Sequence, residues 1–244
     1  GEASGFFASA NDGVMPIRDA LVRIIGRNIN DYLGTVDGAG DVNGDGYHDI
    51  VIGAYRDRTA GSDAGAAFLV LGGCDGASEC GEPTGLFSNV EDGDMSIDDA
   101  DVHLTAERPV DWAGRSVAGA GDVNGDGYSD LLVGAQSYDA EEYGAGAAYL
   151  LLGGCDGAVA CGGSPTGLFD VQASGVMSLS QAHGKFTGEA QNDNAGRSTA
   201  AAGDVNGDGY DDVLIGAYAW NDDTRPGYGY LLLGGCDGNT ECGG

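Results

Sequence analysis

The stretch Gly40-Asp-Val-Asn-Gly-Asp-Gly-Tyr47 recurs, residue for residue, from Gly121 and again from Gly203. Each copy is followed by one variable residue, an aspartate and an apolar run that ends in Gly-Ala, as in Asp49-Ile-Val-Ile-Gly-Ala54. The copies are almost evenly spaced along the 244 residues. Self-similarity at a fixed period indicates a chain of repeated structural units. This stretch therefore decides the architecture, and its side chains indicate a chemistry as well.

Counted from its first aspartate, each copy places oxygen side chains at positions one, three, five and nine, with glycine at position six. A tightly curled loop directs alternate side chains to a common centre, and Ca²⁺ selects hard oxygen donors, whereas Mg²⁺ demands octahedral geometry and keeps its waters. We therefore predict three Ca²⁺ ions, one per repeat. The predicted ligands are the side chains of Asp41, Asn43, Asp45 and Asp49 with the carbonyl of Tyr47; Asp122, Asn124, Asp126 and Asp130 with Tyr128; and Asp204, Asn206, Asp208 and Asp212 with Tyr210.

The loop is like an EF-hand loop in its first half only. An EF-hand has a glutamate at position twelve and a helix on each side. Here the aspartate at position nine is expected to serve as the bidentate ligand, and an apolar strand follows the loop. The alternative is a loop that holds itself by side-chain-to-backbone hydrogen bonds without any ion. Three intact copies of the same donor set favour the ion.

Composition narrows the environment and the partners. The formal net charge is −29, from 39 acidic and 10 basic residues. So acidic a surface argues against nucleic acid or an anionic membrane as partner, because both require basic patches. It suits an extracellular or high-salt setting, where salt screens the repulsion and millimolar calcium fills weak sites. No stretch is long and apolar enough to span a membrane, and we expect a processed or excised piece of a secreted or cell-surface protein.

The cysteines form three pairs with identical spacing, each in Gly-Gly-Cys-Asp-Gly-x-x-x-Cys. We expect a disulfide to close each loop, which implies an oxidising compartment. A zinc site is the alternative, but two cysteines without histidine are half a ligand set. The pairs are Cys74/Cys80, Cys155/Cys161 and Cys236/Cys242.

Aligning the copies over their full length divides the chain into units of 1–80, 81–162 and 163–244. Each unit has four strand candidates; in the middle of the chain they are 116–120, 131–135, 147–152 and 182–187. The two middle candidates are continuous apolar runs, consistent with burial on both faces. An all-β protein with four antiparallel strands per stacked unit has the architecture of β-propeller blades. A β-solenoid is the alternative, but its repeats are shorter.

The repeated loop with its apolar run and Gly-Ala resembles the FG-GAP repeat of the integrin alpha-subunit propeller and its bacterial relatives. The resemblance covers all three units. The Phe-Gly of the family name is replaced by Leu33-Gly34, Ala113-Gly114 and Ala195-Gly196. The resemblance implies a propeller with calcium in the loop between the first two strands of each blade. It also implies adhesion or ligand binding in place of catalysis.

Three units are too few for a ring, because propellers have about four to eight blades. A strand near residues 21–25 occupies the fourth-strand place of a blade that lacks its first three strands, and the last unit lacks its fourth strand. Exposed edges recruit strands. Two chains that exchange terminal strands would form a six-bladed homodimer; alternatively, further blades belong to a longer chain.

The sequence predicts a binding module and no enzyme. The three histidines, His48, His103 and His183, lie in unlike contexts, and no nucleophile elbow, zinc-binding histidine pair or phosphate loop occurs. Trp112, Trp220 and several tyrosines fall in or near loops, where they can stack on sugars, anchor a protein partner, or simply pack between blades. Three functions remain open: a calcium-stabilised adhesion or assembly module, a lectin, and a structural spacer of a surface protein or filament.

Overall fold

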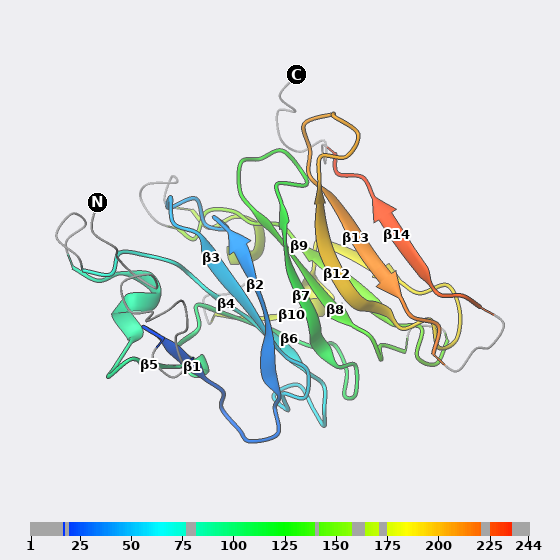
Figure 1. Ribbon diagram of the computed structural model, residues 1–244, viewed down its shortest axis with the longest axis horizontal. Helices are drawn as coiled ribbons and strands as arrows, with labels where there is room; N and C mark the ends of the chain where they lie inside the picture. Colours follow the sequence, from blue (N-terminus) through cyan, green and yellow to red (C-terminus); the bar gives the residue numbers. More distant parts are fainter. Residues whose placement is uncertain are drawn as a thin grey trace, which may run out of the picture.

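A computed structural model describes residues 17, 20–76, 82–139, 142–157, 164–170, 175–220 and 225–235. This part of the chain is all-β, with 14 strands and a few short 3-10 helices. Three twisted sheets lie side by side, so that their first strands, β2, β7 and β12, neighbour one another (Figure 1). The predicted all-β class is therefore confirmed, and the three blades do not close a ring within this chain.

The first two sheets each contain a four-stranded antiparallel blade. Their strand orders are β2-β3-β4-β6 and β7-β8-β9-β11. The first blade comprises β2 (Leu33–Gly40), β3 (Asp49–Ala54), β4 (Ala66–Val70) and β6 (Val102–Thr105). The second comprises β7 (Ala113–Gly121), β8 (Asp130–Ala135), β9 (Ala147–Leu151) and β11 (Gly184–Thr187). The four strands predicted for the middle of the chain are these last four.

The third blade has three strands among the described residues. They are β12 (Ala195–Gly203), β13 (Asp212–Ala217) and β14 (Tyr228–Leu232). The fourth strand of each complete blade comes from the following sequence repeat, so blades and predicted units are offset by one strand. The boundaries of the predicted units stay a prediction.

The strand β1 (Arg23–Ile25) lies where a strand near residues 21–25 was predicted, whereas the short strands β5 (Asp94–Ser96) and β10 (Val176–Ser178) were not predicted. β10 adds in parallel to the outer edge of β6, and β5 pairs in parallel with β1. The 3-10 helices are η2 (Gly85–Asn89), η3 (Ile97–Asp99), η5 (Gly167–Phe169) and η6 (Leu179–Gln181). Side chains of these segments close the core, because Met95, Ile97, Met177 and Leu179 are all buried.

The core lies between the blades. Every residue of β8 is buried, which explains why the repeated runs are apolar without alternation. Leu131 packs toward the first blade and Leu132 toward the third. The Gly-Ala ending of each run sets the distance between blades: a Cβ on Gly134 would lie 2.0 Å from the carbonyl oxygen of Gly196. Only glycine permits that approach.

Candidate metal centres and the opposite loop face

The three metal loops, which join β2 to β3, β7 to β8 and β12 to β13, share one hydrogen-bonded geometry. The carboxylate of Asp41 accepts the N–H groups of Gly44, Asp45 and Gly46 at 2.7, 3.1 and 2.9 Å. Asp122 and Asp204 accept the corresponding groups of their own loops at 2.7–3.1 Å. The position-one aspartate therefore caps the curled loop.

Glycine at position six is required by the backbone. Its φ is +90° at Gly46, +90° at Gly127 and +92° at Gly209, a region that L-residues with a side chain rarely adopt. Glycine is therefore the residue that fits the turn at position six.

Positions three and five bring an amide and a carboxylate together. Asn43 Nδ2 donates to Asp45 Oδ2 at 3.1 Å, and the corresponding distances in the second and third loops are 2.9 and 2.7 Å. The amide oxygen of Asn43 accepts the N–H of Asp45 at 3.2 Å, as the corresponding oxygens do in the other two loops. This oxygen and the carboxylates of positions one and five are hard donors of the kind that Ca²⁺ prefers.

The position-nine aspartates clamp each blade. Asp49 accepts the N–H of Val42 and of Gly72, both at 2.8 Å, and so ties the start of the metal loop to the end of β4. Asp130 and Asp212 make the same pair of bonds in their blades. All three side chains are buried. Sequence reasoning expected a bidentate ligand here and missed the clamp; the role of position nine as a ligand stays a prediction.

Burial changes the pKa values of the position-nine aspartates. Loss of hydration raises the pKa of Asp49 to about 6 and that of Asp130 to about 7, although in each case the two backbone N–H donors lower it. The neighbouring carboxylates at positions one and five raise it further. A carboxylate in this environment gains from a nearby cation.

Within the described ranges, no three acidic, histidine or cysteine side chains gather as a preformed metal-binding group. The oxygen donors of each loop nevertheless suit Ca²⁺. The assignment of Ca²⁺ to these loops stays a prediction. Asn43 Nδ2 also lies 3.2 Å from Asp156 Oδ2, a carboxylate of the second blade's cysteine loop, which sequence reasoning did not place at the metal loops.

The first and second metal loops are each bonded to the next blade. The Val42 carbonyl accepts the N–H of Gly154 at 2.9 Å, and the Val123 carbonyl accepts that of Gly235 at 2.8 Å. The ring of Tyr128 packs on Gly44 of the first loop, as the ring of Tyr210 packs on Gly125 of the second. These two metal loops are therefore junctions between blades as well as turns within them.

The cysteine loops are described in part. Cys74 and Cys155 are each disulfide-bonded, and their N–H groups donate to Thr84 and Thr166 at 2.9 and 2.8 Å. The pairings Cys74/Cys80 and Cys155/Cys161 stay predictions. The cysteines Cys80, Cys161, Cys236 and Cys242 lie outside the described residues.

The opposite end of the blades carries an aromatic groove. A cavity of about 600 Å³ between the second and third blades is lined by Trp112, Tyr143 and Trp220 together with polar side chains. Trp220 is 54 % exposed and Tyr143 70 %. Four residues of its wall have positive φ, namely Val110, Trp112, Asn192 and Asn194. Besides the three aromatic residues, the cavity is lined by Pro109, Val110, Gln136, Ser137, Asp139, Gly144, Gln191, Asn192 and Asn194. Tyr138, which lies close in the sequence to these residues, is buried in the core instead.

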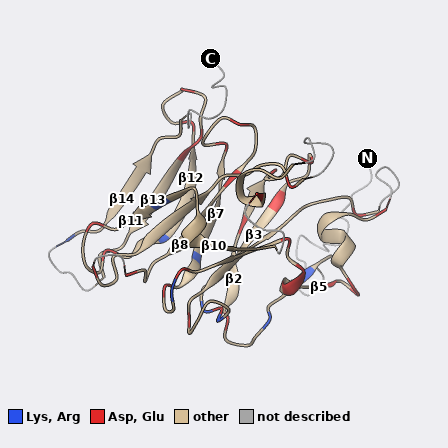
Figure 2. Cartoon of the chain, turned by 180° about the vertical axis from the view of Figure 1, so that it is seen from behind, with Lys and Arg blue, Asp and Glu red and all other residues tan. Residues whose placement is uncertain are grey.

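Charge is distributed unevenly between the two ends. Figure 2 shows that most of the basic residues lie at the end of the blades opposite the metal loops. There Arg56 stacks over Tyr32, Tyr55 and Trp112 at 5.2–5.9 Å from their ring centroids.

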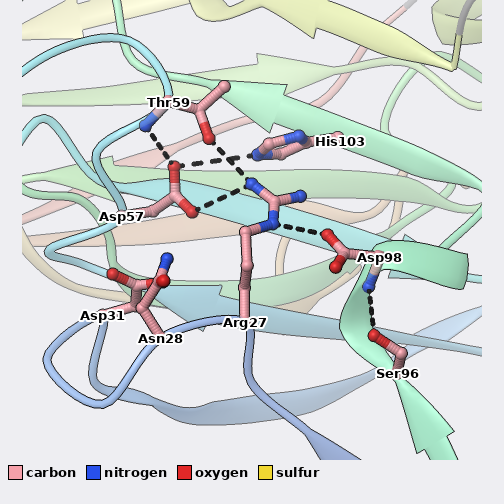
Figure 3. Close-up of polar contacts among 8 residues, drawn as sticks. All are labelled: Arg27, Asn28, Asp31, Asp57, Thr59, Ser96, Asp98 and His103. Atoms are coloured by element: carbon pink, nitrogen blue, oxygen red, sulfur yellow. Dashed lines mark hydrogen bonds and ion pairs between the residues drawn. The ribbon is translucent and has the colours of Figure 1, made fainter.

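A buried polar cluster beside the first blade contains His103 (Figure 3). Its ring stacks on Phe68 with centroids 4.4 Å apart, and its Nε2 lies 4.0 Å from Asp57 Oδ1. Arg27 approaches Asp57 at 3.5 Å and also contacts Asp98. Burial lowers the pKa of His103 below its ordinary value. The charge of Arg27 lowers this pKa further, and the charge of Asp57 opposes the change.

The similarity of this chain to known proteins lies in its blades. The FG-GAP repeat family model matches residues 33–70, 113–151 and 195–232, which are the first three strands of each blade. Integrin alpha-PS2 of Drosophila melanogaster is 30 % identical over 82 % of this chain, which spans 12 % of that relative. Integrin alpha-5 of Xenopus laevis is 26 % identical over 82 % of this chain, and the match spans 16 % of the length of that relative. Among the described residues, no helix is both long and apolar enough to cross a membrane.

Integrin alpha-IIb of Mus musculus is 28 % identical over 81 % of this chain, again across only 16 % of its own length. The matched region, the three repeated loops and the four-stranded antiparallel blades agree with one another. The chain belongs to the FG-GAP repeat proteins and forms an integrin alpha-like domain.

Proposed function

We propose that this chain is a calcium-stabilised, extracellular β-propeller module for adhesion or assembly, with no catalytic role. The observation that carries the proposal is that the first and second metal loops each hydrogen-bond to the next blade, as in the Gly154–Val42 contact. A cation held by positions one, three, five, seven and nine neutralises the carboxylates that converge there. It thereby stabilises the junction as well as the loop.

The extracellular and adhesive parts of the proposal are carried over from the integrin alpha relatives. The net charge of −29 supports them, because it suits a screened, calcium-containing medium. The absence of catalysis is supported by His103: its ring is buried and stacked on Phe68, and its Nε2 is buried without a hydrogen-bond partner.

Thermal melting of the chain with Ca²⁺ and with chelator tests the proposal. We expect millimolar Ca²⁺ to raise Tm by about 5 °C or more, because a ligand that binds only the folded state stabilises it by mass action. Mg²⁺ is the control cation and is expected to give a smaller shift. Calorimetric titration is expected to count three sites, and two in Asp45→Ala. An unchanged Tm and an undetectable heat of binding would contradict the calcium role.

A second candidate, carbohydrate binding, is favoured by the aromatic groove. Exposed rings beside amide side chains, as in Trp220 with Asn192 and Asn194, can stack on a sugar and hydrogen-bond its hydroxyls. A glycan array tests this function, with Trp220→Ala as the loss variant. Tyr32→Ala is the control, since Tyr32 is 50 % exposed but lies outside the groove. An array without signal, or equal signal from both variants, would exclude this groove as a sugar site.

A further inference from the structure

The junction between the first two blades holds two arginines, Arg56 and Arg115, that no other described residue pairs. Every other arginine that the structure describes, and the single lysine, donates a side-chain hydrogen bond. Within the described ranges, the guanidinium groups of Arg56 and Arg115 make neither a hydrogen bond nor an ion pair. In a chain with 39 acidic and 10 basic residues, two such cations at one place require an explanation.

Both guanidinium groups lie on one cluster of aromatic rings. Arg56 is held over Tyr32, Tyr55 and Trp112, and Arg115 Cζ lies 5.0 Å from the centroid of the Tyr55 ring. The Tyr55 ring lies 5.3 Å from that of Tyr32 and 6.0 Å from that of Trp112. A guanidinium that stacks on a ring uses its face, and its in-plane N–H donors remain available to an acceptor. The rings therefore position two cations without satisfying their donors.

Two donors of the cluster are buried without an acceptor among the described residues. They are Arg56 Nε and Trp112 Nε1. A buried N–H group without an acceptor is costly and uncommon in native folds. The cluster is nevertheless open to solvent, because Tyr32 is 50 % exposed and both arginines are half-buried.

The backbone indicates that the rings themselves are retained at a cost. Tyr32 and Trp112 have φ of +54° and +56°, and the third repeat has Asn194 at the same position. Asparagine tolerates this left-handed region, whereas a bulky aromatic residue rarely adopts it. Strained residues of this kind concentrate at binding sites.

The aspartates next to the cluster in the sequence hold other groups. Asp31, Asp57 and Asp111 are all buried and accept hydrogen bonds from elsewhere. Asp57, for example, accepts the N–H of Thr59 at 2.8 Å and pairs with Arg27 at 3.5 Å. The three loops around the cluster, 26–32, 55–65 and 106–112, are described throughout. Their carboxylates therefore leave both guanidinium groups to an acceptor from outside.

The junction between the second and third blades provides an internal comparison. Arg197 stands there in the place of Arg115, and Gln136 in the place of Tyr55. Arg197 donates to Gln136 Oε1 at 2.9 Å, and a serine stands where the first junction has Arg56. The fold therefore does not need unpaired arginines at a junction. The first junction has an extra arginine, and a ring in place of the acceptor.

We infer that this arginine–aromatic cluster binds the carboxylate side chains of a short acidic segment of a partner protein. A guanidinium donates two parallel hydrogen bonds to a carboxylate, and the rings already hold it in place, so that little side-chain freedom is lost on binding. The same rings offer apolar contact to the rest of the segment. A sulfated glycan or another polyanion is disfavoured, because the net charge of −29 repels it beyond these two cations.

The site does not depend on what precedes or follows these three blades. The two blades that form the junction both have four strands. A further blade of a longer chain would stack on the outer face of the first or the third blade and would leave this junction as it is. The inference deepens the proposed adhesion function, on which it rests for its biological sense, by naming the chemistry of a partner.

NMR titration of the isotope-labelled, calcium-loaded chain tests the inference. The probe is the blocked pentapeptide Ser-Glu-Tyr-Glu-Ser, and the control peptide has glutamine in place of both glutamates. We expect the acidic peptide to shift the indole N–H signal of Trp112 and the Nε–H signals of Arg56 and Arg115. The control peptide is expected to bind at least about tenfold more weakly, because it loses the charge-assisted hydrogen bonds. Unchanged signals of these three groups at millimolar acidic peptide would overturn the inference.

Arginine variants assign the binding to the cluster. Arg56→Gln and Arg115→Gln are each expected to raise the Kd of the acidic peptide at least about tenfold. Arg108→Gln is the matched control and is expected to change Kd less than about twofold. It removes the same charge from the same loop as Trp112, but from an arginine that already donates to the Asp139 carbonyl. Equal effects of all three variants would overturn a site at the cluster.

A variant without a charge change tests the unpaired state itself. Tyr55→Gln gives Arg115 the acceptor that Gln136 gives Arg197, and it is expected to weaken binding of the acidic peptide. Thermal melting checks that each variant is folded. Unchanged binding in folded Tyr55→Gln, or a sulfated oligosaccharide that binds more tightly than the peptide, would overturn the inference as stated. A chain that calcium stabilises but that binds no acidic peptide would remove this site and leave the proposed calcium role standing.

Discussion

At the scale of single residues, one motif contains two sets of side chains. The aspartates and the asparagine at positions one, three and five are the proposed cation ligands, whereas the aspartate at position nine accepts buried backbone N–H groups of two segments. Asp49 reaches Gly72 across 23 residues, a contact that no local pattern can reveal. The sequence did carry one indication of this role: Asp49 stands directly before a fully apolar run, and a carboxylate buried with such a run requires hydrogen-bond donors.

Asp130→Asn is expected to lower the free energy of unfolding by about 1–3 kcal/mol, because the amide nitrogen faces a buried N–H that loses its acceptor. Urea unfolding in the presence of chelator measures this effect apart from any metal. Asp99→Asn is the control, since Asp99 is exposed. A loss no larger than that of the control would show that the clamp does not stabilise the blade.

Acidification is expected to destabilise the protein through His103. Because burial lowers the pKa of His103 in the folded state, the unfolded chain binds a proton near pH 6.5 that the folded chain does not. The stability contribution of this residue is therefore present above pH 6.5 and declines as the pH falls below it. Unfolding free energies of the wild-type protein and of His103→Gln, measured between pH 5 and 8, isolate the effect. Parallel pH profiles for the two proteins would refute it.

At the scale of elements, the strands were predictable and their short parallel additions were not. Continuous apolar runs and Gly-Ala endings mark β3, β8 and β13 in the sequence. β5 and β10 have three residues each, too few for a periodic signal. They form because β1 and β6 offer an outer edge and because the 3-10 helices that follow insert apolar side chains into the core.

The glycines that end the repeated runs set how closely the blades approach. Gly134→Ala is expected to cost about 1–3 kcal/mol, because its Cβ would lie 2.0 Å from the Gly196 carbonyl oxygen and the blades must separate to admit it. Gly229→Ala is the matched control on β14, where the added Cβ meets nothing within 4 Å. Chemical denaturation compares the two, and equal losses would contradict a packing origin.

At the scale of the whole molecule, the main features are the net negative charge and the ring that these three blades leave unclosed. Three Ca²⁺ ions would offset only six of the 29 net negative charges. The remaining self-repulsion is long-ranged and is screened by salt. In chelator, raising NaCl from 0.05 to 0.5 M is therefore expected to increase Tm, and Ca²⁺ is expected to reduce that increase. Scanning calorimetry measures both; sucrose at matched osmolality is the control, and a salt-independent Tm in chelator would contradict this account.

The sequence by itself determined the repeat, the strand-forming runs, the hard-donor loops and the family, because these features are local or periodic and need no distant contact. Only the tertiary structure decided that short strands add in parallel at β1 and β6, that the position-nine aspartates are clamps, and that the aromatic residues of two blades form one groove. It also revealed that the first two metal loops lie at the junctions between blades. Those features arise from contacts between segments tens of residues apart, which depend on how the blades stack.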